Sequence, residues 1–398
     1  MMISTSRVRI ISAIIKREVN ISTLAEEDDY DPVFKTMIPM NTWAPILQML
    51  IFFDRGFDQD LERINLSMTD LGNLYERPWR GTSLDEQWKM LNQIIQERQP
   101  KQIGINVGSV QWAAGGLTHN LYTQLLDAIP PAFKGKLVSA EKACEHWLMT
   151  LTSDELDIFT HVAKIAHWFI AECFSPKSIT PGITTTDDLE WAYWQLSIDM
   201  GLDLSFKPFF RIIRRNSRKE IFPVEDKIIR RGDLLHCDVG IRYLRLNSDH
   251  QELAYVLQDG ETNAPEGIVR LLREGNRLQK VFMSEFQEGL TGNQLLGNIL
   301  STAHKQGIPN PRVYSHSLGL YLHEPGPLIG LPWEQVNCPG RGDVKLVHNS
   351  CFTMELSIED KVQEWDNQSV RLSIEQDVMF TVNGCEPIDG LQSEIHLI

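Results

Sequence analysis

Short apolar runs alternate with stretches of helical periodicity along the first part of the chain. Apolar runs that are typical of strands occur at Gln48–Phe53, Gln102–Val107 and Lys136–Ser139. Between them, apolar residues recur at helical spacing in Asp85–Arg98 and His119–Ala128. This alternation predicts an α/β domain whose sheet is covered by helices.

The pattern changes about 150 residues into the chain. An amphipathic stretch at Ser153–Phe174 predicts a long helix whose first residue is the N-cap. A further helix is predicted from Thr186 to Met200 and a helix pair near 265–306, whereas strand patterns dominate the remainder. We therefore expect an N-terminal α/β domain at residues 1–150 and an α+β domain at residues 151–398.

Two of the strand patterns carry glutamates on a polar face. In Phe352–Ile358 the even positions are apolar and the odd positions, which include Glu355, are polar. In Arg371–Phe380 the odd positions as far as Asp377 likewise carry polar residues, among them Glu375. Period-two alternation indicates half-buried strands. A solvated sheet face would give the same alternation, so neither glutamate alone indicates a functional site.

Two aspartates flank a predicted hairpin. Asp238 and Asp249 lie at the ends of a segment that a tight turn around Tyr243 and Leu244 would fold into two antiparallel strands. The two aspartates would then pair directly, with Cβ atoms about 4.5–5.5 Å apart, which suits two metal ions separated by roughly 3.5–4 Å. The turn lacks the Asn-Gly or Asp-Gly that marks a tight hairpin, so this register is plausible but not secured.

These four carboxylates and a histidine, His316, each lie in a short apolar run. If they converge, the site holds four negative charges, which a protein interior tolerates only when cations neutralise them. Two divalent metal ions would cancel the charge and leave room for a bridging hydroxide. The hypothesis is a dinuclear metallohydrolase.

The order and spacing of these segments resemble a known superfamily. Asp238-x10-Asp249, His316–Pro325, Phe352–Glu355 and Ser373–Asp377 together are similar to the creatinase/prolidase/aminopeptidase P/methionine aminopeptidase superfamily. The resemblance covers roughly residues 150–398 and is strongest to the Xaa-Pro aminopeptidase branch. It implies an α+β fold, with a C-terminal pita-bread catalytic domain preceded by a smaller α/β domain like that of creatinase and prolidase.

The resemblance also implies roles for the candidate residues. Asp238 would chelate one metal ion, Asp249 and Glu375 would bridge both, and His316 and Glu355 would bind the other. Glu355 is in addition the candidate general base for the water. The reaction implied is hydrolysis of short peptides at the Xaa-Pro bond. A carboxylate-rich set with one imidazole suits manganese best, with cobalt or zinc as alternatives.

His323 follows His316 by seven residues, at the place where the family has a histidine that contacts the substrate. An odd separation would put the two side chains on opposite faces of a regular strand. A bulge at Gly319 would return them to one face. The alternative for His323 is a core or surface histidine without a catalytic role.

The chain departs from its relatives at three positions. The family has histidines where this sequence has Ile221 and Arg312, and an arginine where it has Ser373, with Arg371 two residues further back. An arginine cannot shuttle protons at neutral pH, but it offers a fixed bidentate fork to a carboxylate. We therefore predict that Arg312 binds a substrate carboxylate or a local acidic residue. The substrate range is expected to shift toward short or acidic peptides.

The residues next to Asp238 and Asp249 in the sequence are interpreted mainly as structural. Alternation points Cys237 away from Asp238, so an inert core thiol is expected. His236 shares the face of Asp238 and is either a site residue or structural, and His250 should face away from Asp249.

Composition restricts the partners. The net charge of −15 argues against a nucleic-acid groove, and the basic run at 211–219 is a local exception typical of a solvated loop or a substrate-side rim. The six cysteines show no CxxC spacing, which favours reduced thiols.

Ala44–Phe53 is too short to span a membrane. Ile10–Ile15 is more typical of an amphipathic helix than of a secretory signal. A cytoplasmic protein follows, and the resemblance implies a homodimer.

Other functions remain open at this point. One is a different enzyme on the same scaffold, either a creatinase-like hydrolase or a metal-assisted lyase. Creatinases lack the metal-ligand set, so the five ligands count against that version. Another is a non-catalytic binding protein that kept the fold. Within the peptidases, the sequence does not separate an aminopeptidase from a dipeptidase.

Overall fold

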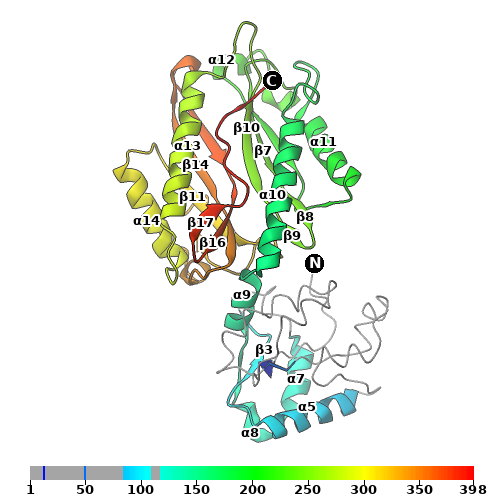
Figure 1. Cartoon of the computed structure of the whole chain (residues 1–398). Helices are drawn as coiled ribbons and strands as arrows, with labels where there is room; N and C mark the ends of the chain where they lie inside the picture. The colour runs from blue at the N-terminus through cyan, green and yellow to red at the C-terminus, as the bar shows by residue number, and fades with distance from the viewer. Residues whose placement is uncertain (1–11, 14–48, 51–83, 109–116) are drawn as a thin grey trace. The chain divides into compact units, whose positions relative to one another are not determined.

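A computed structural model describes residues 12–13, 49–50, 84–108 and 117–398 of the protein (Figure 1). The chain divides into two compact units, Met1–Leu148 and Met149–Ile398, and each is described by itself. No helix among the described residues is long and apolar enough to cross a membrane.

The first unit contains a parallel strand pair with helices packed around it. Its elements are α5 (Leu84–Arg98), β3 (Ile103–Ile105), α7 (His119–Ala128), α8 (Pro131–Lys134), β4 (Leu137–Ser139) and α9 (Glu141–Met149). Strands β3 and β4 pair in parallel, as a strand–helix–strand connection requires. Their apolar faces join a core with residues of α5 and α7 that includes Ile94, Ile103 and Leu125. The helices predicted at Asp85–Arg98 and His119–Ala128 and the strands predicted at Gln102–Val107 and Lys136–Ser139 are confirmed.

Two predictions for this unit lie largely outside the described residues. Of the predicted strand Gln48–Phe53, the structure describes β2 (Met49–Leu50). It pairs antiparallel with β1 (Ser12–Ala13). The helix predicted at Ile10–Ile15 is therefore wrong at these two residues, because their backbone groups bond to a partner strand.

In the second unit, helices cover the two outer faces of several strand layers. The helices are α10 (Ser153–Cys173), α11 (Thr186–Asp199), α12 (Asn216–Lys219), α13 (Glu266–Ser284) and α14 (Gly292–Lys305). Figure 1 shows α10 and α11 on one side of the strands and α13 and α14 on the other. The predicted helices are confirmed, with one shift. Thr152, rather than Ser153, caps α10, in a reciprocal capping box with Glu155.

One sheet has the strand order β18-β10-β7-β6 and packs against α10 and α11. Its strands are β6 (Phe209–Ile213), β7 (Leu234–Val239), β10 (His250–Tyr255) and β18 (His396–Leu397). A small sheet of β5 (Asp203–Leu204), β8 (Ile241–Tyr243) and β9 (Leu246–Asn247) continues from it.

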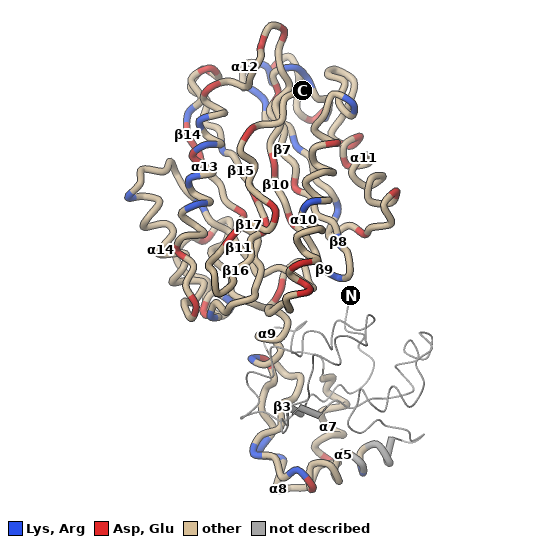
Figure 2. The backbone as a smooth tube through the Cα atoms, viewed as in Figure 1, with Lys and Arg blue, Asp and Glu red and all other residues tan. Residues whose placement is uncertain are grey.

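The larger sheet has the order β15-β14-β11-β13-β16-β17, with β12 paired to β11. Its strands are β11 (Arg312–Leu318), β12 (Leu328–Ile329), β13 (Ser350–Thr353), β14 (Glu355–Val362), β15 (Gln368–Ile374), β16 (Asp377–Thr381) and β17 (Gly384–Pro387). One face of this larger sheet packs against α13 (Glu266–Ser284) and α14 (Gly292–Lys305), around residues such as Ile268, Leu296 and Phe352. Figure 2 shows acidic residues among the strands of this unit, between the two helical layers.

The predicted hairpin register is wrong by two residues. Asp238 pairs with Gln251 and not with Asp249. The turn between β8 and β9 is centred on Leu244 and Arg245, which have φ of 47° and 69°. Two successive positive φ values are typical of a type I′ turn, which normally requires Asn or Gly. Leucine and arginine there give no sequence signal, so the centre of the turn could not be located from the sequence.

Glycine is required at the point where β7 passes into β8. A Cβ at Gly240 would lie 1.9 Å from the carbonyl oxygen of Ser248 on the returning strand. This close approach interrupts the ladder directly after β7 and directly before Asp249. Asp249 therefore lies at the interruption, whereas Asp238 stays within the ladder, one residue before the end of β7 and opposite Gln251.

Candidate metal centre

The four-stranded sheet (β18-β10-β7-β6) and the larger sheet of the second unit join at Gln251 and Glu375. The backbone N–H of Gln251 donates to the carbonyl oxygen of Glu375 (3.0 Å), and the N–H of Glu375 donates to that of Gln251 (3.1 Å). Glu375 lies between β15 and β16, where the strand is interrupted. Because Gln251 is also opposite Asp238, this junction brings Glu375 beside the hairpin that carries Asp238 and Asp249.

Three of the predicted ligands form a tight cluster. Ligand atoms of Asp249, His316 and Glu375 all lie within 4.8 Å of one another, and all three residues are buried. The His316 Nε2 is 3.9 Å from the Asp249 Oδ2. One oxygen of Asp249 (Oδ1) and one of Glu375 (Oε1) are buried without a hydrogen-bond partner. Unpartnered buried carboxylate oxygens are costly, and this donor set fits a divalent cation that would satisfy them.

Asp238 and Glu355 lie next to this cluster. Gln251 links them to it, since its Nε2 donates to Glu375 Oε2 (2.7 Å) and to Asp238 Oδ2 (3.5 Å). A side-chain hydrogen bond from Gln251 also acts on Glu355. Glu355 is the first residue of β14 and pairs with Tyr314 of β11, whose ring centroid is 5.6 Å from that of His316.

The four carboxylates of the site are buried, and all four have raised pKa values. Burial raises the pKa of Asp238 to about 6 and that of Glu355 to about 7. Burial, and then the neighbouring carboxylates, raises the pKa of Asp249 and of Glu375 well above the ordinary values. Without cations the charged form is therefore strongly disfavoured, whereas divalent cations would stabilise it.

The two histidines of the 316–325 segment lie together. The ring centroids of His316 and His323 are 4.2 Å apart. The predicted strand with a bulge is not formed, because β11 ends at Leu318 and the chain turns back, with the Glu324 N–H donating to the Ser317 carbonyl oxygen (2.9 Å). Burial, and then His323, lowers the pKa of His316 to about 3, so its imidazole is neutral, as a metal ligand must be.

Arg312 is placed apart from the cluster. It is exposed at the start of β11, and its Nη1 donates to the carbonyl oxygen of Pro332 (2.8 Å). The charge of Arg312 also contributes to the lowered pKa of Glu359, after Ser369 and Arg371. Its observed hydrogen bond is thus to a backbone oxygen, and its charge acts on a local acidic residue.

Sequence reasoning missed two residues that face the carboxylates. Gln251 was missed because nothing in the sequence marks a glutamine as a contact of several carboxylates. Arg211 of β6 was assigned to a loop or rim, but it is half-buried, and its charge lowers the pKa of both Asp238 and Glu355. The alternation of a strand at 209–213 is the signal that would have found it. Positions 209–213 form a strand, so Arg211 shares a face with its cross-strand partner His236.

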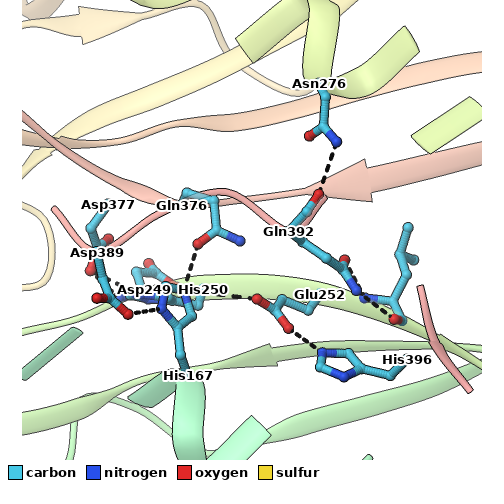
Figure 3. A network of polar contacts seen from close by, with 11 residues as sticks. His167, Asp249, His250, Glu252, Asn276, Gln376, Asp377, Asp389, Gln392 and His396 are labelled. Atoms are coloured by element: carbon cyan, nitrogen blue, oxygen red, sulfur yellow. Dashed lines mark hydrogen bonds and ion pairs between the residues drawn. The ribbon is translucent and has the colours of Figure 1, made fainter. Parts of the chain in front are cut away.

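A second polar network lies behind Asp249 (Figure 3). The Asp249 N–H donates to Asp377 Oδ2 (3.2 Å), and Asp377 Oδ2 is 3.3 Å from His250 Nδ1. The His250 ring contacts that of His167 from α10 at 4.3 Å. His167 Nδ1 in turn lies 2.7 Å from Asp389 Oδ2. His250 faces away from the cluster, as predicted, and the network fixes the backbone that carries Asp249.

Comparison with known proteins identifies relatives of this arrangement. The Metallopeptidase family M24 matches residues 157–381, which include every candidate residue. No curated protein matches the sequence. The fold is similar to that of an X-Pro aminopeptidase from Thermotoga maritima MSB8, with a TM-score of 0.60 and 18% identity over 89% of this chain and 90% of that chain. It is also similar to that of a Xaa-Pro dipeptidase from Bacillus anthracis, with a TM-score of 0.57 and 18% identity over 88% and 86%. At these identities the likeness concerns the fold.

Proposed function

The chain belongs to metallopeptidase family M24, and we propose that it hydrolyses short peptides at the bond that precedes proline. Membership confirms the predicted superfamily and its α+β pita-bread fold. The observation that carries the proposal is the buried cluster of Asp249, His316 and Glu375, with an unpartnered oxygen on each carboxylate. The solved structures with this fold that bear the names X-Pro aminopeptidase and Xaa-Pro dipeptidase support the choice of substrate.

The metal-binding part of the proposal assigns five ligands to two ions. Asp238 would hold one ion, His316 and Glu355 would hold the other, and Asp249 and Glu375 would contribute to both. The charge supports two ions, because four carboxylates and two divalent cations sum to zero. When bound, such ions lower the pKa of water toward neutrality and polarise the scissile carbonyl. Manganese is the proposed metal, with cobalt or zinc as alternatives.

The chain's own residues supply proton transfer and orientation. Glu355 accepts the proton of the attacking water, a role for which a carboxyl poised near neutral pH is suited. His323, which lies beside His316 and is exposed, contacts the substrate next to the scissile bond. Gln251 orients Glu375 and Asp238 through its amide N–H groups. The homodimer and the cytoplasmic location stay predictions.

The test combines metal analysis with a substrate panel. Protein purified without chelator should hold about two divalent ions per chain. It should cleave Ala-Pro or Ala-Pro-Ala but neither Ala-Ala nor creatine. Fewer than about one ion per chain, with no gain on adding Mn²⁺, would contradict the dinuclear site. Cleavage of creatine alone, or of no Xaa-Pro peptide by the metal-loaded protein, would move the assignment to the other enzyme or binding functions.

His323 and Arg312 are expected to differ in their contribution to catalysis. His323→Ala should lower kcat/KM by about 10²-fold, because a positioned imidazole next to the reacting groups is lost. Arg312→Ala should have a smaller effect, because Arg312 is exposed and donates to Pro332. Steady-state kinetics on a Xaa-Pro panel at equal metal content measures both. If Arg312→Ala left every kcat/KM within about twofold, its predicted substrate role would be wrong.

A further inference from the structure

Arg211 reaches the carboxylate cluster from a strand that contributes none of the proposed ligands. In the β6–β7 register it is opposite His236, and Phe209 is opposite Asp238. Directly opposed residues share a face of a sheet, so Arg211 lies on the face that carries Asp238. The next cation along, Arg214, is occupied elsewhere, because it is fully buried in a two-bond pair with Asp233.

The guanidinium of Arg211 is directed at the cluster without forming an ordinary ion pair. Its Nη2 donates to Ser373 Oγ at 3.4 Å, and its Nε is buried without a partner. No carboxylate of the described residues is paired with it within 4.0 Å. Burial lowers the pKa of Arg211, and the charges of Asp238 and Glu355 oppose that shift. The cation therefore acts on two proposed ligands without a direct ion pair to either.

Ser373 gives this arrangement a second observation. It lies on β15, two residues before Glu375, and so shares that residue's side of the strand. Because the Arg211 guanidinium ends beside the Ser373 hydroxyl, an arginine side chain carried by residue 373 could reach the same volume. The family resemblance places an arginine at this position, where this chain has serine.

We propose that Arg211 is a positioning residue that orients Asp238 and Glu355 for metal binding, from a strand opposite to position 373. This inference rests on the proposed metal-dependent function. Its guanidinium supplies the positive charge that holds the two carboxylates at the edge of the cluster. Arg211 does not touch the reacting atoms and does not select the substrate, so its removal affects all substrates alike.

The experiment moves the charge between the two positions. Arg211→Ser removes it, and the double variant Arg211→Ser with Ser373→Arg restores it from the other strand. Arg371→Ser is the matched control. Arg371 lies on β15, like Ser373, but pairs with Glu359 and not with the cluster. Mn²⁺ affinity is measured by calorimetry on metal-free protein, and kcat/KM is measured on Xaa-Pro peptides with neutral and acidic first residues. Circular dichroism checks that each variant is folded.

Removal of the charge should weaken Mn²⁺ binding and lower kcat/KM, each by about 10- to 100-fold. The factor in kcat/KM should be the same for neutral and acidic peptides, the double variant should recover most of the loss, and Arg371→Ser should resemble the wild type. A cation that merely repels metal would give tighter Mn²⁺ binding when removed, which overturns the proposal. A loss confined to acidic peptides, or no recovery in a folded double variant, also overturns it. If no Xaa-Pro peptide is cleaved by the wild type, the peptidase function fails, and the Mn²⁺ titration still decides the role of Arg211.

Discussion

Glu355→Gln is expected to abolish hydrolysis and at the same time to stabilise the metal-free protein. The loss of activity should reach at least ~10²–10⁴-fold, because the variant lacks both the proposed general base and a carboxylate ligand. The gain in stability has a different cause. Burial raises the pKa of Glu355 from 4.5 to about 7, so its ionised form is unfavourable in the metal-free fold. Glutamine has a similar shape and no charge.

The sign of the pH dependence follows from that raised pKa. The stability that protonated Glu355 gives is fully present below pH 4.5 and is lost as pH rises through about 7. The advantage of Glu355→Gln in the free energy of unfolding should therefore grow between about pH 4.5 and 7, to on the order of 1–3 kcal/mol. Urea unfolding of chelator-treated wild type and variant at both ends of this range measures it. An advantage that does not change with pH would contradict the electrostatic explanation.

Arg214→Met is expected to cause the largest loss of stability. Arg214 has no exposed surface and donates to both Asp233 oxygens, at 2.7 Å and 2.6 Å, and to the carbonyl oxygen of Ile228. The substitution would leave the Asp233 carboxylate buried without its partner. Such a change costs about 3–5 kcal/mol in the free energy of unfolding. Because Asp233 directly precedes β7, the strand that carries Asp238 would be affected first.

Arg215→Met is the matched control. Arg215 also pairs with an aspartate, Asp366, at 2.6 Å, but both side chains of that pair are partly exposed. It should cost at most about 1 kcal/mol. Urea unfolding of the metal-loaded variants compares the two. Removing both partners, as in Arg214→Met with Asp233→Leu, should recover part of the loss, since no charge is then left buried. Equal stability of Arg214→Met and Arg215→Met would refute this explanation.

Periodicity predicted the elements of the catalytic unit well, because its helices and strands are long and have one apolar face. The helices that start at Ser153 and Thr186 and the strand that carries Glu355 are found, whereas the predicted strand Arg371–Phe380 is broken at Glu375 and Gln376. Periodicity did not predict how strands are interrupted. Glu375 lies at a break between two strands, where its backbone bonds to Gln251 of the other sheet. That junction depends on contacts between residues far apart in the chain.

The errors in the candidate site have the same origin. The hairpin register depends on Leu244 and Arg245 in a conformation that these residue types rarely adopt, so local sequence could not give it. His323 reaches His316 through a reversal after Leu318, which strand alternation cannot describe. Arg211 and Gln251 are ordinary residues until the fold places them beside carboxylates. Ligand identity was predicted from residue types in a known order, whereas the residues that support the ligands required three-dimensional contacts.

Anomalous X-ray diffraction from crystals grown with Mn²⁺ tests the central claim most directly. The account predicts two manganese peaks roughly 3.5–4 Å apart. Carboxylate oxygens of Asp249 and Glu375 should lie between the peaks, Asp238 should bind one ion, and His316 and Glu355 should bind the other. Both peaks should disappear from crystals of a chelator-treated protein. A single ion, ions bound elsewhere in the molecule, or no anomalous peak at this cluster would contradict the dinuclear metallopeptidase.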